Sequence, residues 1–128
     1  MITEDYVSFE TAKLLKEKGF NEPCRGNYYW GFDDKDNSIV EFGEWTAQAY
    51  NNDFEDEAFI CSAPTLQMAM KWLREKHKMF IRVIQSHIAY CTCEIYYEMV
   101  KYYNFRESFA SYEEACEAAI KYCLENLI

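Results

Sequence analysis

The chain has 128 residues, half of them hydrophobic, so it is long and apolar enough to fold as a single domain over residues 1–128. Its formal net charge of −9 repels phosphate backbones, and direct binding to nucleic acid is therefore not expected. The N-terminus is acidic where a signal peptide needs basic residues, and charge-free runs such as residues 83–93 are too short to span a membrane. We expect a cytoplasmic protein that does not bind membranes and whose six cysteines are reduced thiols.

The first predicted element is a helix from about Ser8 to Lys18. Ser8 can cap it, because a serine hydroxyl accepts one of the free backbone N–H groups of the first turn. Gly19 can end it, because glycine adopts the left-handed conformation without strain. Three short segments rich in aromatic and apolar residues follow, and a polar turn separates the first two. They predict strands at residues 28–32, 39–45 and 58–61.

The second half of the chain predicts a further helix and two strands. This helix follows Pro64, which a first turn tolerates because its missing N–H would have no partner there, and it runs to Lys78. Residues 80–88 are apolar and β-branched, and in residues 90–103 apolar and polar side chains alternate with the period of a half-buried strand. Lys101 interrupts this alternation, so a β-bulge or a strand end is expected near it.

The last helix begins at the sequence Ser-Tyr-Glu-Glu of residues 111–114. This is a capping box, in which the serine and the second glutamate satisfy each other's free backbone N–H groups. The order of elements is therefore α-β-β-β-α-β-β-α. Short connections favour antiparallel pairing of the strands. We expect a two-layer α+β fold with a mostly antiparallel sheet of about five strands and three helices.

Two features resemble metal sites. Residues 33–38 contain three aspartates, but isoleucine and tryptophan occupy the places where a calcium-binding EF-hand loop needs glycine and glutamate. Cys91 and Cys93 point to one side of a strand and could bind zinc with His87, but the chain has no Cys-x-x-Cys pair. A solvated turn and buried core thiols are the favoured interpretations, and neither a metal nor a cofactor is expected.

The chain contains no recognisable catalytic motif. His77 and His87 are its only histidines, and although Ser86 or Cys24 could serve as a nucleophile, no local signature supports such a pair. Acidic residues are so abundant that a pair of carboxylates carries little information, and no phosphate-binding or dinucleotide-binding loop is present. We therefore do not expect an enzyme.

Charge and tyrosine are distributed unevenly. Residues 1–64 carry 14 acids and five bases, whereas residues 65–128 carry eight of each, with five bases between Lys71 and Arg82. This contrast is either ordinary surface variation or a basis for self-association through opposite patches. Paired aromatic residues could stack nucleic-acid bases, but without a basic groove a core residue beside an exposed one is the favoured interpretation. The candidates for a protein-contact surface are Tyr96, Tyr102, Trp72, Lys71, Arg74 and Lys78.

Three segments of the chain resemble helix starts of small phage and prophage proteins of gut bacteria, a group without an assigned activity. The longest is Ala-Pro-Thr-Leu-Gln-Met-Ala-Met-Lys-Trp-Leu-Arg-Glu at residues 63–75, and the others are residues 7–15 and 111–115. The segments cover about a third of the chain. The resemblance implies a mobile-element setting and assigns no functional residue.

The expected function is that of a non-enzymatic phage or mobile-element accessory protein that acts through protein–protein contact. Its partner is an unidentified protein, and a homo-oligomer is one form that such contact can take. One alternative is an acidic decoy that occupies a basic, nucleic-acid-handling protein. The other alternative is a small enzyme with an unrecognised site.

Overall fold

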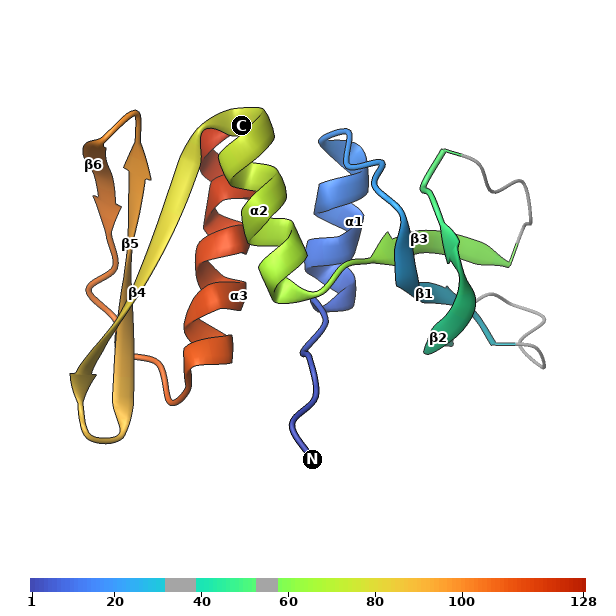
Figure 1. The fold of residues 1–128 in the computed structure, drawn as a ribbon, viewed down its shortest axis with the longest axis horizontal. Helices are drawn as coiled ribbons and strands as arrows, with labels where there is room; N and C mark the ends of the chain where they lie inside the picture. Colours follow the sequence, from blue (N-terminus) through green and yellow to red (C-terminus); the bar gives the residue numbers. More distant parts are fainter. Residues whose placement is uncertain (32–38, 53–57) are drawn as a thin grey trace. The chain divides into compact units, whose positions relative to one another are not determined.

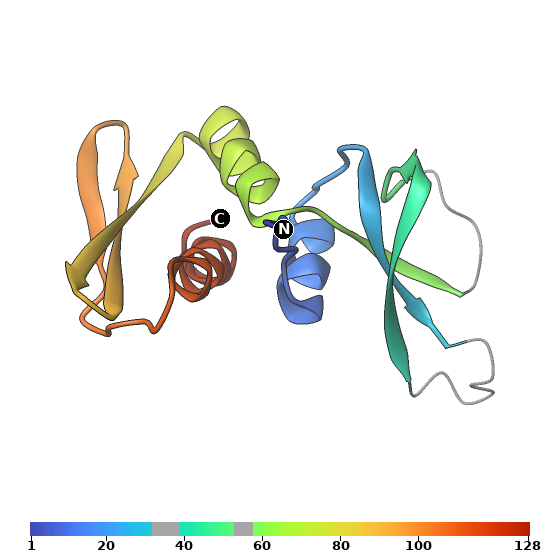
Figure 2. The ribbon, with the colours of Figure 1, turned by 60° about the horizontal axis from the view of Figure 1, so that its bottom comes forward.

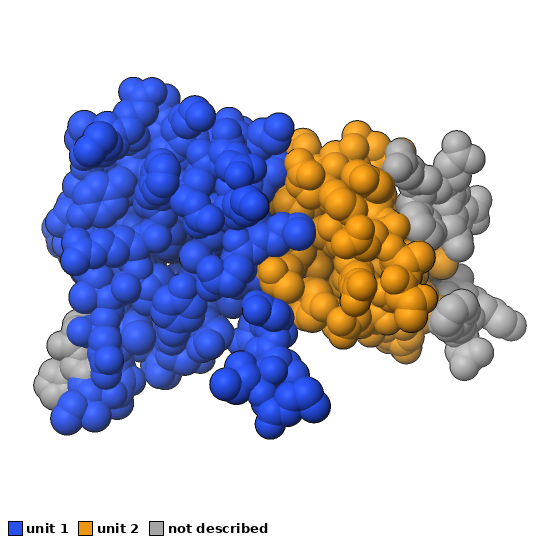
Figure 3. Space-filling view, in the orientation of Figure 1, with its two compact units in different colours: residues 1–5, 66–128 blue, residues 6–65 orange. Residues whose placement is uncertain are grey.

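The computed structural model describes residues 1–31, 39–52 and 58–128, apart from the side chains of residues 86 and 87. This part of the chain has an α+β fold with three α-helices and two three-stranded antiparallel sheets (Figure 1). Its Cα positions divide into two compact units (Figure 3). Unit 1 is formed by residues 1–5 and 66–128, and unit 2 by residues 6–65. The single domain expected over residues 1–128 stays a prediction, and each unit is described by itself.

In unit 2, one helix lies on one face of a sheet with the strand order β2-β1-β3 (Figure 2). Strand β1 pairs antiparallel with both neighbours. The elements are α1 (Phe9–Glu17), β1 (Cys24–Trp30), β2 (Val40–Ala49) and β3 (Phe59–Ala63).

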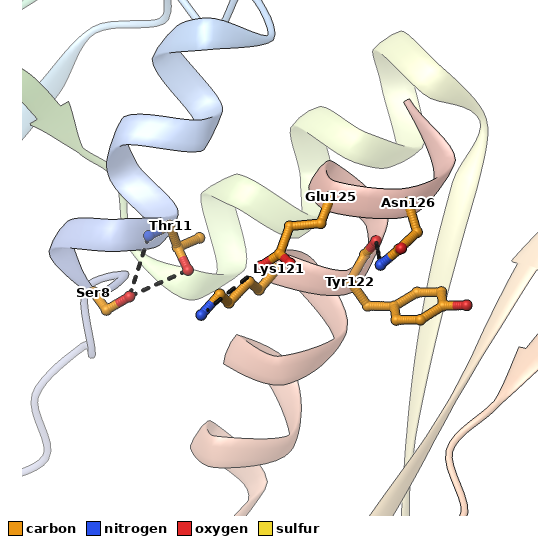
Figure 4. Close-up of polar contacts among 6 residues, drawn as sticks. All are labelled: Ser8, Thr11, Lys121, Tyr122, Glu125 and Asn126. Carbon is orange, nitrogen blue, oxygen red and sulfur yellow. Dashed lines mark hydrogen bonds and ion pairs between the residues drawn. The ribbon is translucent and has the colours of Figure 1, made fainter.

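Helix α1 begins and ends as its sequence predicts. The backbone N–H of Thr11 donates to Ser8 Oγ at 3.3 Å, and the Ser8 hydroxyl donates to Thr11 Oγ1 at 3.2 Å (Figure 4). At the other end, Gly19 has a φ of 94°, which a residue with a Cβ adopts only with strain. The chain then turns Phe20 into the core, where its side chain is buried.

The core of unit 2 lies between α1 and the sheet. Tyr28 of β1 contacts the rings of Phe9 and Phe42 with centroid distances of 5.3 and 5.5 Å, and its hydroxyl donates to the Val7 carbonyl oxygen at 2.7 Å. Apolar side chains fill the space around this cluster. The buried ones include Val7, Ala12, Leu15, Phe20, Cys24, Cys61 and Ala63.

In unit 1, a sheet with the order β4-β5-β6 is combined with two helices. Both helices lie on the same side of the sheet in the two ribbon views (Figure 1, Figure 2). A π-helical turn follows the second helix at Cys123–Leu127. The elements are α2 (Leu66–His77), β4 (Met79–His87), β5 (Tyr90–Tyr97), β6 (Val100–Asn104) and α3 (Tyr112–Tyr122). No helix within the described ranges is long and apolar enough to cross a membrane.

Small side chains bring α3 close to the sheet. Cys93 of β5 forms a fully buried cluster with Ala115 and Ala119 of α3, and partly buried aliphatic and aromatic side chains surround it. At the edge of this contact, Tyr103 of β6 stacks on Tyr122 with a centroid distance of 4.0 Å. Because alanine and cysteine add little bulk, the helix and the sheet pack without a gap between them.

The capping box of α3 is present with one difference. The Glu114 backbone N–H donates to Ser111 Oγ at 3.1 Å, as predicted, but Glu114 Oε2 accepts the N–H of Ala110 at 3.2 Å. At the other end, Lys121 and Glu125 form an ion pair, and the Asn126 amide donates to the Tyr122 carbonyl oxygen (Figure 4). The helix is therefore held by local polar contacts at both ends.

The predicted long strand at residues 90–103 is in fact two strands. Glu98 and Met99 have φ values of 48° and 70° and form a two-residue turn between Tyr97 and Val100. Positive φ at both central residues is the geometry that hairpins favour, but Asn-Gly or Asp-Gly is its usual sequence. Met99 is one of the apolar residues in the alternation of residues 90–103, but its side chain is 95% exposed. With this division the described chain has six strands, and they form two three-stranded sheets. The predicted single sheet of about five strands is therefore wrong, although the α+β class is confirmed.

The irregularity expected near Lys101 is confirmed. Ile95 pairs with Tyr103, but Tyr96 pairs with Lys101, so Tyr102 is an extra residue in β6. An extra residue opposite a regular strand is a β-bulge, and it bends the strand that carries it.

Replacing Met99 by glycine should stabilise the protein. Left-handed conformations strain a residue that has a Cβ, and the exposed Met99 side chain has little packing to lose. We expect a gain of about 0.5–1 kcal/mol in the free energy of unfolding, because glycine removes more strain than it adds in chain entropy. Urea unfolding measures it. Met99→Ala is the control, because alanine keeps the Cβ, and an equal gain from both substitutions would contradict the prediction.

Candidate functional site

Within the described part of unit 1, no helix or strand covers the sheet face opposite α3. We call this the outer face. It follows from the strand register, in which Phe80 pairs with Tyr96, and Arg82 with Glu94. Their side chains alternate with those of Ile81, Val83 and Cys93, which pack toward α3. The outer face is formed by Phe80, Arg82, Ile84, Thr92, Glu94, Tyr96, Lys101 and Asn104.

A carboxylate at the centre of the outer face is largely removed from water. Glu94 is only 7% exposed, and its Oε2 lies 2.6 Å from Lys101 Nζ and accepts the Tyr96 hydroxyl at 2.9 Å. The hydrogen bond from Lys101, followed by that from Tyr96, holds the pKa of Glu94 below its usual value. The same contact raises the pKa of Lys101. Glu94 therefore stays ionised and paired, as suits a structural group rather than a proton-transfer group.

Large apolar side chains surround this polar centre and remain open to water. Phe80 of β4 is 49% exposed, and Tyr102, on the bulge of β6, is 60% exposed. Arg82 lies beside Glu94 and is exposed. Aromatic rings next to a cation and a satisfied ion pair form a surface suited to burial against another protein.

The structure separates the residues that the sequence nominated for a contact surface. Tyr96 lies on the outer face and Tyr102 beside it, whereas the three cations of the set belong to α2 or its end. Of these, Lys71 and Lys78 are exposed and Arg74 is half-buried.

Trp72 is a correction to that set. Its side chain is only 6% exposed, and its ring lies 4.7 Å from that of His77. A buried tryptophan cannot offer a contact surface without unfolding part of its helix. Phe80 and Arg82 were not nominated, although their two-residue spacing on an apolar strand was the available signal. The sequence of β4 does not show which of its two faces points to solvent, because that depends on how β4 pairs with β5.

The other candidate chemistry does not converge in the described residues. These contain no group of three or more His, Cys, Asp or Glu side chains that could hold a metal ion. His77 packs on Trp72, and burial lowers its pKa. The calcium-like turn at residues 33–38 lies outside the described residues, as do the side chains of Ser86 and His87.

Every cysteine in the structure is a free thiol, and five of the six are buried. Burial raises the pKa of the Cys61 and Cys116 thiols to about 11. It raises those of Cys24, Cys93 and Cys123 to about 12. Thiols of this kind are core residues, because a nucleophilic cysteine needs a low pKa.

Comparison of the chain with protein-family models, with curated proteins and with solved structures gave no match. The resemblance of its helix starts to small phage proteins therefore stays a prediction.

The five buried thiols should react slowly with Ellman's reagent. Their raised pKa values keep them protonated at mildly alkaline pH, and the surrounding side chains exclude the reagent. We expect all six cysteines to be labelled at once in guanidinium chloride, but only the half-buried Cys91 to react readily in the native protein. Absorbance during the reaction gives both counts. Rapid labelling of several thiols in the native state would contradict their burial.

Replacing Glu94 by Gln should destabilise the protein in a pH-dependent way. The pKa of Glu94 lies below its ordinary value of 4.5, so the ionised carboxylate contributes stability above that pH and loses it as the pH falls through the folded-state pKa. We expect Glu94→Gln to be less stable than the wild type at neutral pH and the difference to shrink in acid.

Urea unfolding at several pH values measures this difference. Glu98→Gln is the control, because Glu98 is exposed in the turn after β5 and should tolerate the change at every pH. On the alkaline side, the pKa of Lys101 is raised, so its contribution is lost only as the pH rises through that value. A difference between Glu94→Gln and the wild type that does not vary with pH would rule out this role of the ion pair.

Proposed function

We propose that this chain is a non-enzymatic accessory protein that acts by protein–protein contact through the outer face of the sheet β4-β5-β6. The observation that carries the proposal is the exposure of Phe80 and Tyr102 beside the ion pair of Glu94 and Lys101. Burying such rings removes apolar surface from water, which is the main favourable term in protein association. A centre whose polar atoms are already paired can be covered without leaving them unsatisfied.

The occupant that we propose is a second copy of the chain, bound through its acidic unit. The outer face carries two cations, Arg82 and Lys101, against the single carboxylate of Glu94. Residues 6–65 carry 12 acids and five bases, which is a net charge of −7. Oppositely charged surfaces steer association and fix its orientation. The contact joins different surfaces of the two copies, so it is heterologous.

The biological setting is part of the proposal. The resemblance of residues 63–75 to small phage proteins suggests a mobile-element accessory protein. Self-association supports that role, since it multiplies the surfaces that a small protein can present.

The proposal predicts that association weakens with salt and on reversal of one charge. Sedimentation velocity over a range of protein concentrations should show oligomers at low salt and dissociation at high salt. Arg82→Glu should weaken association by about tenfold, the effect of losing about 1.4 kcal/mol. Phe80→Ser should also weaken it by removing apolar contact area.

Arg106→Glu is the matched control, because Arg106 is an exposed arginine in the loop between β6 and α3 and undergoes the same change of charge. A chain that stays monomeric at every concentration and salt would overturn the proposal. So would an Arg106→Glu chain that loses association as much as the Arg82→Glu chain does.

A further inference from the structure

A buried amide lies at the centre of the sheet β2-β1-β3 in unit 2. Asn27 of β1 pairs with Gly43 of β2 on one side and with Ser62 of β3 on the other. Its neighbour Tyr28 points to the face that α1 covers, so the side chain of Asn27 lies on the opposite face. We call this opposite side the far face of the sheet.

The amide of Asn27 is only half satisfied. Its Nδ2 donates to the carbonyl oxygen of Arg25 at 3.0 Å. Its Oδ1 is fully buried and accepts no hydrogen bond. Buried acceptors in folded proteins nearly always have a partner, so such an atom requires an explanation. An acceptor that awaits a donor from a ligand is one explanation that experiment can test.

Aromatic rings lie beside Gly43, the residue that pairs with Asn27 in β2. The rings of Trp45 and Phe59 lie 6.4 Å apart between centroids, although their strands stand on opposite sides of β1. A Cβ at Gly43 would lie 2.9 Å from Tyr29 Cε1 and 3.3 Å from Trp45 Nε1. The missing side chain of Gly43 therefore lets both rings approach the strand next to Asn27.

The surroundings of these rings favour a cation. Glu41 pairs with Tyr29 in the strand register, so it lies on the far face; it is exposed, and its Oε1 would be 3.4 Å from a Cβ at Gly31. The Lys16 ammonium already lies 5.5 Å from the centroid of Phe59. Strand β1 itself contributes one cation to the far face, because alternation places Arg25 on the same side as Asn27 and Tyr29. The net charge of −7 on unit 2 adds a long-range attraction for a positive ligand.

We propose that the far face binds the guanidinium group of an arginine side chain presented by a basic partner polypeptide. The guanidinium stacks on the rings of Tyr29 and Trp45 and donates an N–H to Asn27 Oδ1, while the Glu41 carboxylate, beside Gly31 on the same face, attracts its charge from a distance. Arginine fits better than lysine, because its planar group stacks on rings while its five N–H donors remain available at the edge. Since Asn27 is covered in the unbound chain, one of the rings turns aside about its side-chain torsions to admit the ligand.

This site lies on a different sheet from the outer face and does not depend on the self-association proposed above. The probe is the peptide acetyl-Gly-Arg-Gly-amide, titrated into the ¹⁵N-labelled full chain. The reporters are the NMR signals of the Trp45 indole N–H and the Asn27 side-chain amide. Two further peptides carry lysine or citrulline in place of arginine, and citrulline keeps the shape of arginine without its charge. We expect saturable shifts with arginine, weaker binding with lysine and none with citrulline.

Three substitutions test the named contacts. Asn27→Leu keeps the size of the side chain and removes the acceptor, so we expect binding to weaken about tenfold while thermal stability is kept or raised. Asn126→Leu is its matched control, because Asn126 is an exposed asparagine that belongs to neither sheet, and it should leave binding unchanged. Glu41→Gln should weaken binding and reduce its dependence on salt. Trp45→Leu should weaken it several-fold by removing the stacking surface.

The outcomes separate this proposal from the preceding one. Repeating the titration with the Arg82→Glu chain should still give saturable shifts with the arginine peptide, because Arg82 lies on the other sheet and makes no contact in this site. Equal shifts with the arginine and citrulline peptides, or no saturable shift at all, would overturn the arginine site. Full binding by Asn27→Leu would also overturn it. If that variant fails to fold, unchanged binding by both Glu41→Gln and Trp45→Leu leads to the same conclusion.

Discussion

A three-stranded sheet has two faces, and among the described residues of each unit helices cover only one of them. The uncovered face must therefore be compatible with water or with a partner, while its strands still need side chains that favour an extended backbone. Unit 1 and unit 2 meet this constraint in different ways.

Unit 1 places charge at the centre of its uncovered face and apolar rings around it. Glu94 would be unfavourable among Phe80, Ile84 and Tyr96 if it were alone, but Lys101 and the Tyr96 hydroxyl satisfy it. Unit 2 has the reverse arrangement. There the aromatic rings of Tyr29 and Trp45 lie over a polar centre, and that centre keeps an unsatisfied acceptor. The carboxylate of the first face is paired, whereas the second face keeps one acceptor without a hydrogen bond.

Local signals in the sequence were sufficient for the helices. The hydroxyl oxygens of Ser8 and Ser111 each accept a hydrogen bond from the backbone N–H three residues ahead, so a few neighbouring residues are enough to predict these helix starts. The hairpin after β5 was missed because Glu98 and Met99 carry none of the usual turn residues. The number of sheets was missed because strand pairing depends on contacts between distant parts of the chain.

For the candidate sites too, features set by neighbouring residues could be predicted from the sequence, whereas features set by strand pairing could not. Alternation within β5 places Tyr96 on an exposed sheet face, whereas the place of Tyr102 depends on the bulge in β6, which only the pairing with β5 reveals. Trp72 was misplaced because the inner stripe of α2 is wider than the spacing of its aliphatic residues suggests. The significance of Asn27 could not be read from the sequence at all. It depends on Gly43 and Ser62, which only the strand register brings beside it.

The chain enters and leaves unit 2 at one place. Tyr6 forms an antiparallel bridge with Thr65, and the backbone N–H of Val7 donates to the Pro64 carbonyl oxygen at 3.0 Å. One step further out, within unit 1, the N–H of Leu66 donates to the Asp5 carbonyl oxygen at 2.9 Å. Residues 6–65 thus have the topology of an insertion, with both ends held as hydrogen-bonded neighbours. A segment of this kind can be gained, lost or exchanged between genes without leaving a gap in the host chain, because the two flanking residues already lie side by side.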